Sequence, residues 1–147
     1  VKAVQLSDKL LEATINMDHE TVAEILEETH DMNTAPKFYN NEQALRSVVV
    51  MAYLSCMDHY MKFEELASGK GYSDILFLPN AGSPKPALLI ELKWDKSAPG
   101  AILQIKKKNY AQILKKFEYQ GEVLLVGINY NSKTKKHSYK IEKYLKK

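Results

Sequence analysis

Three charged side chains lie where apolar runs of this sequence begin or end. Glu91 and Lys93 interrupt the last residues of ALLIELKW, and Asp74 directly precedes the apolar run ILFLP. Two carboxylates bind Mg²⁺ or Mn²⁺, and an ammonium group stabilises phosphate charge or helps to activate a metal-bound water. This combination predicts a centre for phosphodiester hydrolysis, in which Asp74 and Glu91 bind the metal ion and Lys93 acts beside them.

Strand geometry would bring the three groups together. Side chains alternate between the two faces of a strand, so Glu91 and Lys93 share a face of the strand at residues 87–94. If the strand that Asp74 opens is its antiparallel neighbour, the start of one lies beside the end of the other. An acid, any residue and a lysine also occur together by chance, and an ordinary ion pair at a strand end explains them about equally well.

Apolar periodicity predicts the elements that hold this centre. The spacing favours two acidic helices with Asp18 as the cap of the second, then a third helix capped by Asn40 or Asn41. A hairpin, a buried strand, a basic helix and two strands follow. The predicted elements occupy residues 7–18, 19–32, 40–60, 60–79, 87–94, 101–119, 122–130 and 135–145.

This order predicts an α/β fold with a mixed sheet, because an antiparallel meander leads into a crossover helix. We expect one domain, in which the acidic helices of residues 1–39 pack on a core formed by residues 40–147. A single cysteine excludes an internal disulfide bond and a cysteine zinc site. The sequence shows no secretory leader and no apolar run long enough for a membrane span, so a cytoplasmic location is expected.

Charge is distributed unevenly along the chain. Residues 1–92 carry 7 basic and 14 acidic side chains, whereas residues 93–147 carry 14 lysines and 4 acids. This asymmetry favours a polyanionic partner for the second part, although a well-solvated surface is an equal explanation. The lysines at 106–108 have the same two explanations. Surface or capping positions, rather than metal ligation, are expected for the four histidines, which are His19, His30, His59 and His137.

Three segments resemble a known nuclease family. GKGYSDILFLP, ALLIELKWDKSAPGAILQIKKKNY and LLVGINYNSKTKKHSYKIE are similar to the PD-(D/E)XK domain at the C-terminus of bacterial AAA-ATPase-like proteins, over roughly residues 40–143. The resemblance implies a restriction-endonuclease-like core of order α-β-β-β-α-β-β. It also implies Mg²⁺ or Mn²⁺ as cofactor, DNA rather than RNA as substrate, and an ATPase domain in the same polypeptide.

The same resemblance assigns roles to individual residues. Asp74 and Glu91 would be the two metal-binding acids and Lys93 the catalytic lysine. Glu42 would be the helical acid that some members add to the metal site, and Gln104 matches a glutamine that contacts substrate or positions the site. The main-chain carbonyl of Leu92 is a further candidate metal ligand. A catalytically silent nucleic-acid-binding, regulatory or partner-docking module with the same fold remains the alternative.

Overall fold

The computed structural model describes residues 2–33, 42–64, 74–107 and 114–144. Its helices are α1 (Lys2–Ile15), α2 (His19–Asn33), α3 (Glu42–Ala52), a short 3-10 helix η2 (Leu54–Asp58) and α4 (Ala98–Lys107). Its strands are β1 (Tyr60–Glu64), β2 (Ile75–Pro79), β3 (Ala87–Trp94), β4 (Val123–Asn131) and β5 (Lys136–Lys143).

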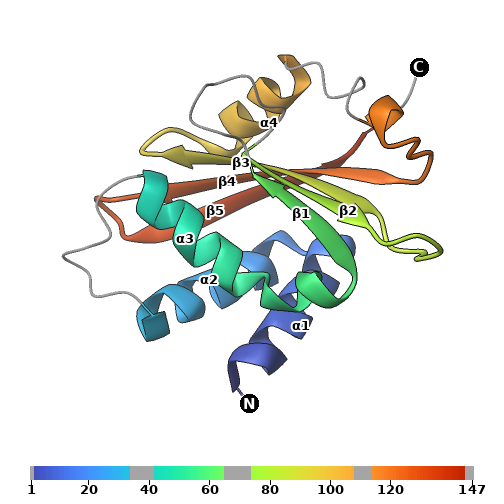
Figure 1. The fold of residues 1–147 in the computed structure, drawn as a ribbon. Coiled ribbons are helices and arrows are strands. Elements are labelled where there is room, and N and C mark those ends of the chain that lie inside the picture. Colours follow the sequence, from blue (N-terminus) through green and yellow to red (C-terminus); the bar gives the residue numbers. More distant parts are fainter. Residues whose placement is uncertain (1, 34–41, 65–73, 108–113, 145–147) are drawn as a thin grey trace.

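The five strands form one mixed sheet in the order β1-β2-β3-β4-β5. All neighbours are antiparallel except β3 and β4, which run parallel because α4 crosses over between them. Helices α1, α2 and α3 cover one face of the sheet, and α4 covers the other (Figure 1). The predicted α/β class with a mixed sheet is therefore confirmed.

The larger core lies between the sheet and the three N-terminal helices. Strand β3 contributes Leu88, Ile90 and Leu92 to it, as the alternation of the sequence predicts. Buried hydroxyl groups reinforce this core: the Tyr53 and Thr14 hydroxyls are 2.8 Å apart, and the Tyr53 and Tyr139 hydroxyls are 3.3 Å apart. These contacts join α1 to the edge strand β5 through one buried tyrosine, Tyr53.

The smaller core lies under α4 and includes the alternate side chains of β3. Ala87 and Leu89 pack there with Ile102 and Ile105 of α4. The helix approaches the sheet closely at Gly127 of β4, where an added Cβ atom would lie only 2.5 Å from the carbonyl oxygen of Ala98. Glycine thus permits the close packing that fixes α4 over the ends of β3 and β4.

Several boundaries differ from the sequence prediction, and the first helix begins at Lys2, five residues before the predicted start at residue 7. The helix expected over residues 40–60 ends at Ala52, and Tyr60 begins β1 instead. Tyr60 is buried and donates its hydroxyl proton to the Pro86 carbonyl at 2.7 Å, so tertiary packing overrides the helical spacing. The basic helix begins at Ala98, three residues earlier than predicted.

The start of α2 at His19 agrees with the sequence prediction. The Asp18 carboxylate accepts a hydrogen bond from the Thr21 amide at 3.2 Å, which confirms the predicted cap of α2. The proposed caps at 40 and 41 lie outside the described residues. In the described part of the chain, no helix has the length and apolar character needed to cross a membrane.

Candidate functional site

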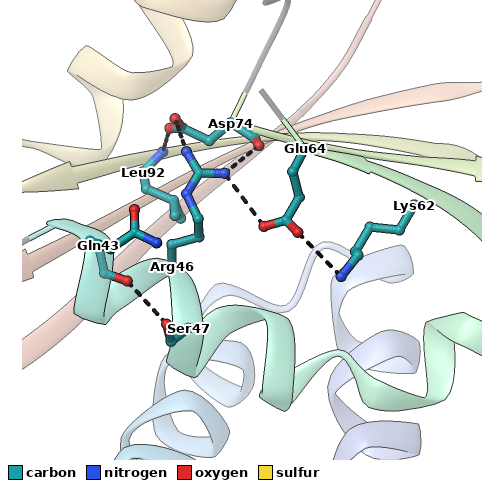
Figure 2. Close-up of polar contacts among 7 residues, drawn as sticks. All are labelled: Gln43, Arg46, Ser47, Lys62, Glu64, Asp74 and Leu92. Atoms are coloured by element: carbon teal, nitrogen blue, oxygen red, sulfur yellow. Dashed lines mark hydrogen bonds and ion pairs between the residues drawn. The ribbon is translucent and has the colours of Figure 1, made fainter. Parts of the chain in front are cut away.

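The start of β2 and the end of β3 meet at one end of the sheet. Ile75 pairs with Ile90 in the antiparallel register, so the next positions outward are Asp74 and Glu91. The Leu92 amide donates a hydrogen bond to Asp74 Oδ2 at 2.7 Å (Figure 2). The carboxylate of Asp74 is thereby fixed against the backbone between Glu91 and Lys93.

Glu91 and Lys93 lie on the face of the sheet that α4 covers. Glu91 is only 2% exposed, although it carries a carboxylate. Lys93 is half-buried, and its Nζ donates a hydrogen bond to Oε1 of Gln104 on α4. Because α4 is held close to the sheet, Gln104 fixes the end of a long, otherwise mobile side chain. The structure therefore brings the predicted lysine and glutamine together.

Arg46 of α3 is a functional candidate that the sequence reasoning missed. Its Nη1 donates to the main-chain oxygen of Asp74 at 2.7 Å, and its Nη2 donates to Asp74 Oδ1 at 2.9 Å. Glu64 of β1 lies nearby, with Oε1 3.7 Å from Nη1 (Figure 2). Arg46 is the sole arginine in a chain with 20 lysines. This could have indicated a specific role, because the planar guanidinium makes two directed hydrogen bonds at once and an ammonium group does not.

Comparison with protein families agrees with this arrangement. A model of the PD-(D/E)XK nuclease superfamily matches residues 40–140, about two thirds of the chain. The chain belongs to the PD-(D/E)XK nuclease superfamily. No curated protein matches it. The match covers α3, α4, strands β1 to β4 and the first part of β5, and it includes every residue of the candidate site.

PD-(D/E)XK nucleases generally use divalent metal ions, and the described donors suit such an ion. Mg²⁺ keeps several water ligands and commonly takes only one or two carboxylates from the protein. Asp74 and Glu91 supply that number, and the guanidinium on Asp74 shows that this carboxylate accepts a cationic partner. Among the described residues, no three His, Cys, Asp or Glu side chains form a metal-holding cluster. An ion here would therefore need water or substrate oxygens to complete its coordination.

The remaining predicted ligand is not tested by this structure. Glu42 is the first residue of α3, but its side chain lies outside the described residues. Position 42 precedes Arg46 by one helical turn, so the two positions share a side of α3. The role of Glu42 as an additional ligand stays a prediction.

The loop after Lys93 is firmly attached to the turn between β4 and β5. Asp95 accepts hydrogen bonds from the Ser132 amide at 2.7 Å and from its hydroxyl at 2.6 Å. These two bonds hold the pKa of the Asp95 carboxyl below its usual range. The Lys96 amide also donates to Asn129 Oδ1 at 2.9 Å. The chain leaving the candidate site is therefore held in one conformation on the β4 side.

The histidine prediction was wrong for two of the four residues. His30 is 8% exposed and His137 is 5% exposed, and their rings pack edge to face with centroids 5.6 Å apart. His137 also packs on Tyr130, with centroids 4.7 Å apart. These two histidines belong to an aromatic cluster between α2, the end of β4 and the start of β5, rather than to the surface.

Proposed function

We propose that this PD-(D/E)XK domain is a Mg²⁺- or Mn²⁺-dependent nuclease that hydrolyses phosphodiester bonds in DNA. One observation carries the proposal: the carboxylate of Asp74 is hydrogen-bonded to the amide of Leu92, the residue between Glu91 and Lys93. Two acids and a lysine from two neighbouring strands thus lie at one end of the sheet, which supports the proposal. This is the set of groups that metal-assisted phosphoryl transfer requires.

The protein groups have separate roles in this proposal. Asp74 and Glu91 would hold the ion, with the Leu92 carbonyl and Glu42 as further ligands. An ion held there would supply polarisation of the scissile phosphate and a lowered pKa of a coordinated water. Lys93 presents its ammonium group to the phosphate charge, and its hydrogen bond to Gln104 keeps that group in place.

Exposed lysines at the same end of the sheet support a nucleic-acid substrate. Lys96 follows β3 directly, and Lys133 and Lys135 lie in the turn after β4, which runs parallel to β3. These side chains are exposed and suit contacts with a phosphate backbone. Lys106 of α4 is less available, because its Nζ pairs with Glu142 at 2.8 Å.

The wider context of the domain is part of the same proposal. The resemblance to domains at the C-terminus of AAA-ATPase-like proteins supports an ATPase domain in the same polypeptide and a cytoplasmic location. The domain's own chemistry is tested without that partner.

The test compares cleavage of supercoiled, linear and single-stranded DNA in Mn²⁺, Mg²⁺ or EDTA. Asp74→Asn keeps the shape of the side chain and removes its charge, and Lys93→Ala removes the ammonium group. Asp58→Asn is the matched control, because Asp58 is an exposed acid beside the start of β1, at the opposite end of the sheet. We expect metal-dependent cutting that both site variants lose and the control keeps.

Each other outcome has a clear meaning. Cutting that persists in Asp74→Asn would refute the assignment of the metal site. DNA binding without cutting by the wild type in any metal would refute the nuclease and support the silent module. RNA cleavage in preference to DNA would correct the substrate while retaining the chemistry.

A further inference from the structure

Arg46 neutralises the carboxylate that the proposed function assigns to the metal ion. Its guanidinium binds Asp74 twice, through the main-chain oxygen at 2.7 Å and through Oδ1 at 2.9 Å (Figure 2). Both side chains are shielded from solvent, with exposed fractions of 19% for Arg46 and 13% for Asp74. Shielding strengthens the attraction between the two charges, because little water screens them.

The two oxygens of Asp74 are used differently. Oδ2 accepts from the Leu92 amide, a neutral backbone donor that fixes the direction of the carboxylate. Oδ1 accepts from the guanidinium, which carries a full positive charge. A divalent cation that approaches Oδ1 meets this guanidinium at the same oxygen and is repelled by its charge. The ion and Arg46 therefore oppose each other at Asp74.

Glu64 supplies a second partner for the same arginine. Its Oε1 is 3.7 Å from Arg46 Nη1, too far for a hydrogen bond but close enough for an ion pair. Its other carboxylate oxygen is 3.4 Å from the Nζ of Lys62 on the same strand. A small displacement of the guanidinium away from Asp74 Oδ1 would thus replace Asp74 by Glu64 as its carboxylate partner. Asp74 would then pair with the ion, so no charge would be left unpaired.

We infer that Arg46 competes with the divalent ion for Asp74 Oδ1, and that loading of the metal moves its guanidinium toward Glu64. This inference rests on the proposed function, because it requires a metal ion at Asp74. Arg46 is then a positioning residue that holds the acid in place before the ion arrives and sets the metal affinity of the site. Its presence weakens metal binding.

The test is a calorimetric titration of Mn²⁺ into the wild-type chain, Arg46→Met and Lys62→Met. Methionine replaces either cation with an uncharged, unbranched side chain. Lys62→Met is the matched control, because it removes the same charge from the neighbourhood of Glu64 without a contact to Asp74. We expect Arg46→Met to bind Mn²⁺ about tenfold more tightly, equivalent to about 1.4 kcal/mol. The control should stay within about twofold of the wild type.

Glu64→Gln tests the proposed second position of the arginine. Glu64 is 37% exposed, so this substitution does not depend on the repacking of a core. We expect it to weaken Mn²⁺ binding several-fold, because the displaced guanidinium loses its carboxylate partner. Thermal denaturation gives a second readout. Arg46→Met should lower the melting temperature in EDTA, and saturating Mn²⁺ should remove most of that difference.

Equal or weaker Mn²⁺ binding by Arg46→Met would overturn the inference and leave Arg46 as a support for Asp74 alone. Absence of Mn²⁺ binding in both proteins would also overturn it. Failure of the nuclease proposal is a separate result, because it is seen as absence of DNA cleavage, whereas failure of this inference is seen in the Mn²⁺ affinities. Tighter binding by Arg46→Met in a chain that cuts no DNA would keep the competition and reject turnover.

Discussion

Gly127 of β4 lies where α4 approaches the sheet and where Glu91 is the paired residue on β3. A Cβ atom added at this position would lie 2.5 Å from the Ala98 carbonyl oxygen and 3.1 Å from both Ala101 Cβ and Ile102 Cγ1. The nearest of these atoms belongs to the backbone of a helix, so it cannot rotate away. We therefore predict that Gly127→Ala displaces α4 from the sheet.

The size of the effect follows from these distances. Ordinary van der Waals contact begins near 3.4 Å, so the helix must retreat by about 0.9 Å at Ala98. Overpacking of this kind costs about 1–3 kcal/mol, and the upper half of that range applies when the backbone must move. Replacement of glycine within a strand returns about 0.5–1 kcal/mol of conformational entropy. We expect a net loss of about 2 kcal/mol in the free energy of unfolding.

Urea denaturation followed by far-ultraviolet circular dichroism measures this loss directly. Gly100→Ala on α4 is the matched control, because its Cβ would meet a side-chain atom, the Ser97 hydroxyl oxygen, rather than backbone. Rotation of this hydroxyl loses its hydrogen bond from the Gly100 amide, and the higher helix propensity of alanine offsets that loss. The control should lie within about 1 kcal/mol of the wild type. A Gly127→Ala midpoint equal to that of the wild type would refute the close packing of α4.

The same displacement has a consequence at the candidate site. Gln104 belongs to α4, so a helix that moves as a unit carries its Oε1 away from Lys93 Nζ. If cleavage is established, Gly127→Ala should reduce the turnover rate more than Gly100→Ala does, although neither glycine is one of the proposed catalytic residues. Unchanged turnover in a destabilised Gly127→Ala protein would separate the position of Gln104 from catalysis.

Two further predictions concern buried polar groups in the larger core. Tyr53→Phe should lower the free energy of unfolding by about 1 kcal/mol in urea denaturation, because it removes the 2.8 Å hydroxyl contact with Thr14 of α1; an unchanged midpoint would contradict this. Burial, with a smaller contribution from the charge of His30, lowers the pKa of His137 to about 3, whereas an unfolded histidine titrates near 6.5. The wild type should therefore lose stability as pH falls through 6.5, by about 2 kcal/mol at pH 5 from this residue, and His137→Phe should show a shallower decline. Parallel stability curves for the two proteins would refute the neutral, buried state of His137.

The strand pattern allowed much of the fold to be predicted. Alternation within residues 87–94 correctly separated Leu88 and Ile90 from Ala87 and Leu89, which belong to different cores. The same alternation predicted that Glu91 lies on the face of β3 that carries Ala87 and Leu89, because residues two apart in a strand share a face. The order of the elements then followed, since parallel β3 and β4 need a crossover element.

The missed features depend on contacts between distant parts of the chain. Helix α3 ends at Ala52, before the predicted end at Tyr60, and the Tyr60 hydroxyl donates to the Pro86 carbonyl, which lies 26 residues further along the chain. Local spacing cannot show such a contact. The burial of His30 and His137 likewise depends on a contact between α2 and β5. Gly127 offered a partial signal, because a glycine inside an apolar strand often marks a close approach of backbone.

Arg46 shows why a nuclease-like site of this kind needs more than its acids. Asp74 lies beside the end of β3 and its side chain is only 13% exposed, so its charge needs a partner. The guanidinium of Arg46 and the Leu92 amide stabilise that charge, so the strand ends can pack without a metal ion. A lysine at position 46 would bring one charge but could not span both the main-chain oxygen and Oδ1 of Asp74 with a fixed fork. If Asp74 binds the metal ion as proposed, the geometry that preorganises this acid also opposes the ion, and stability without the ion is linked to weaker affinity for it.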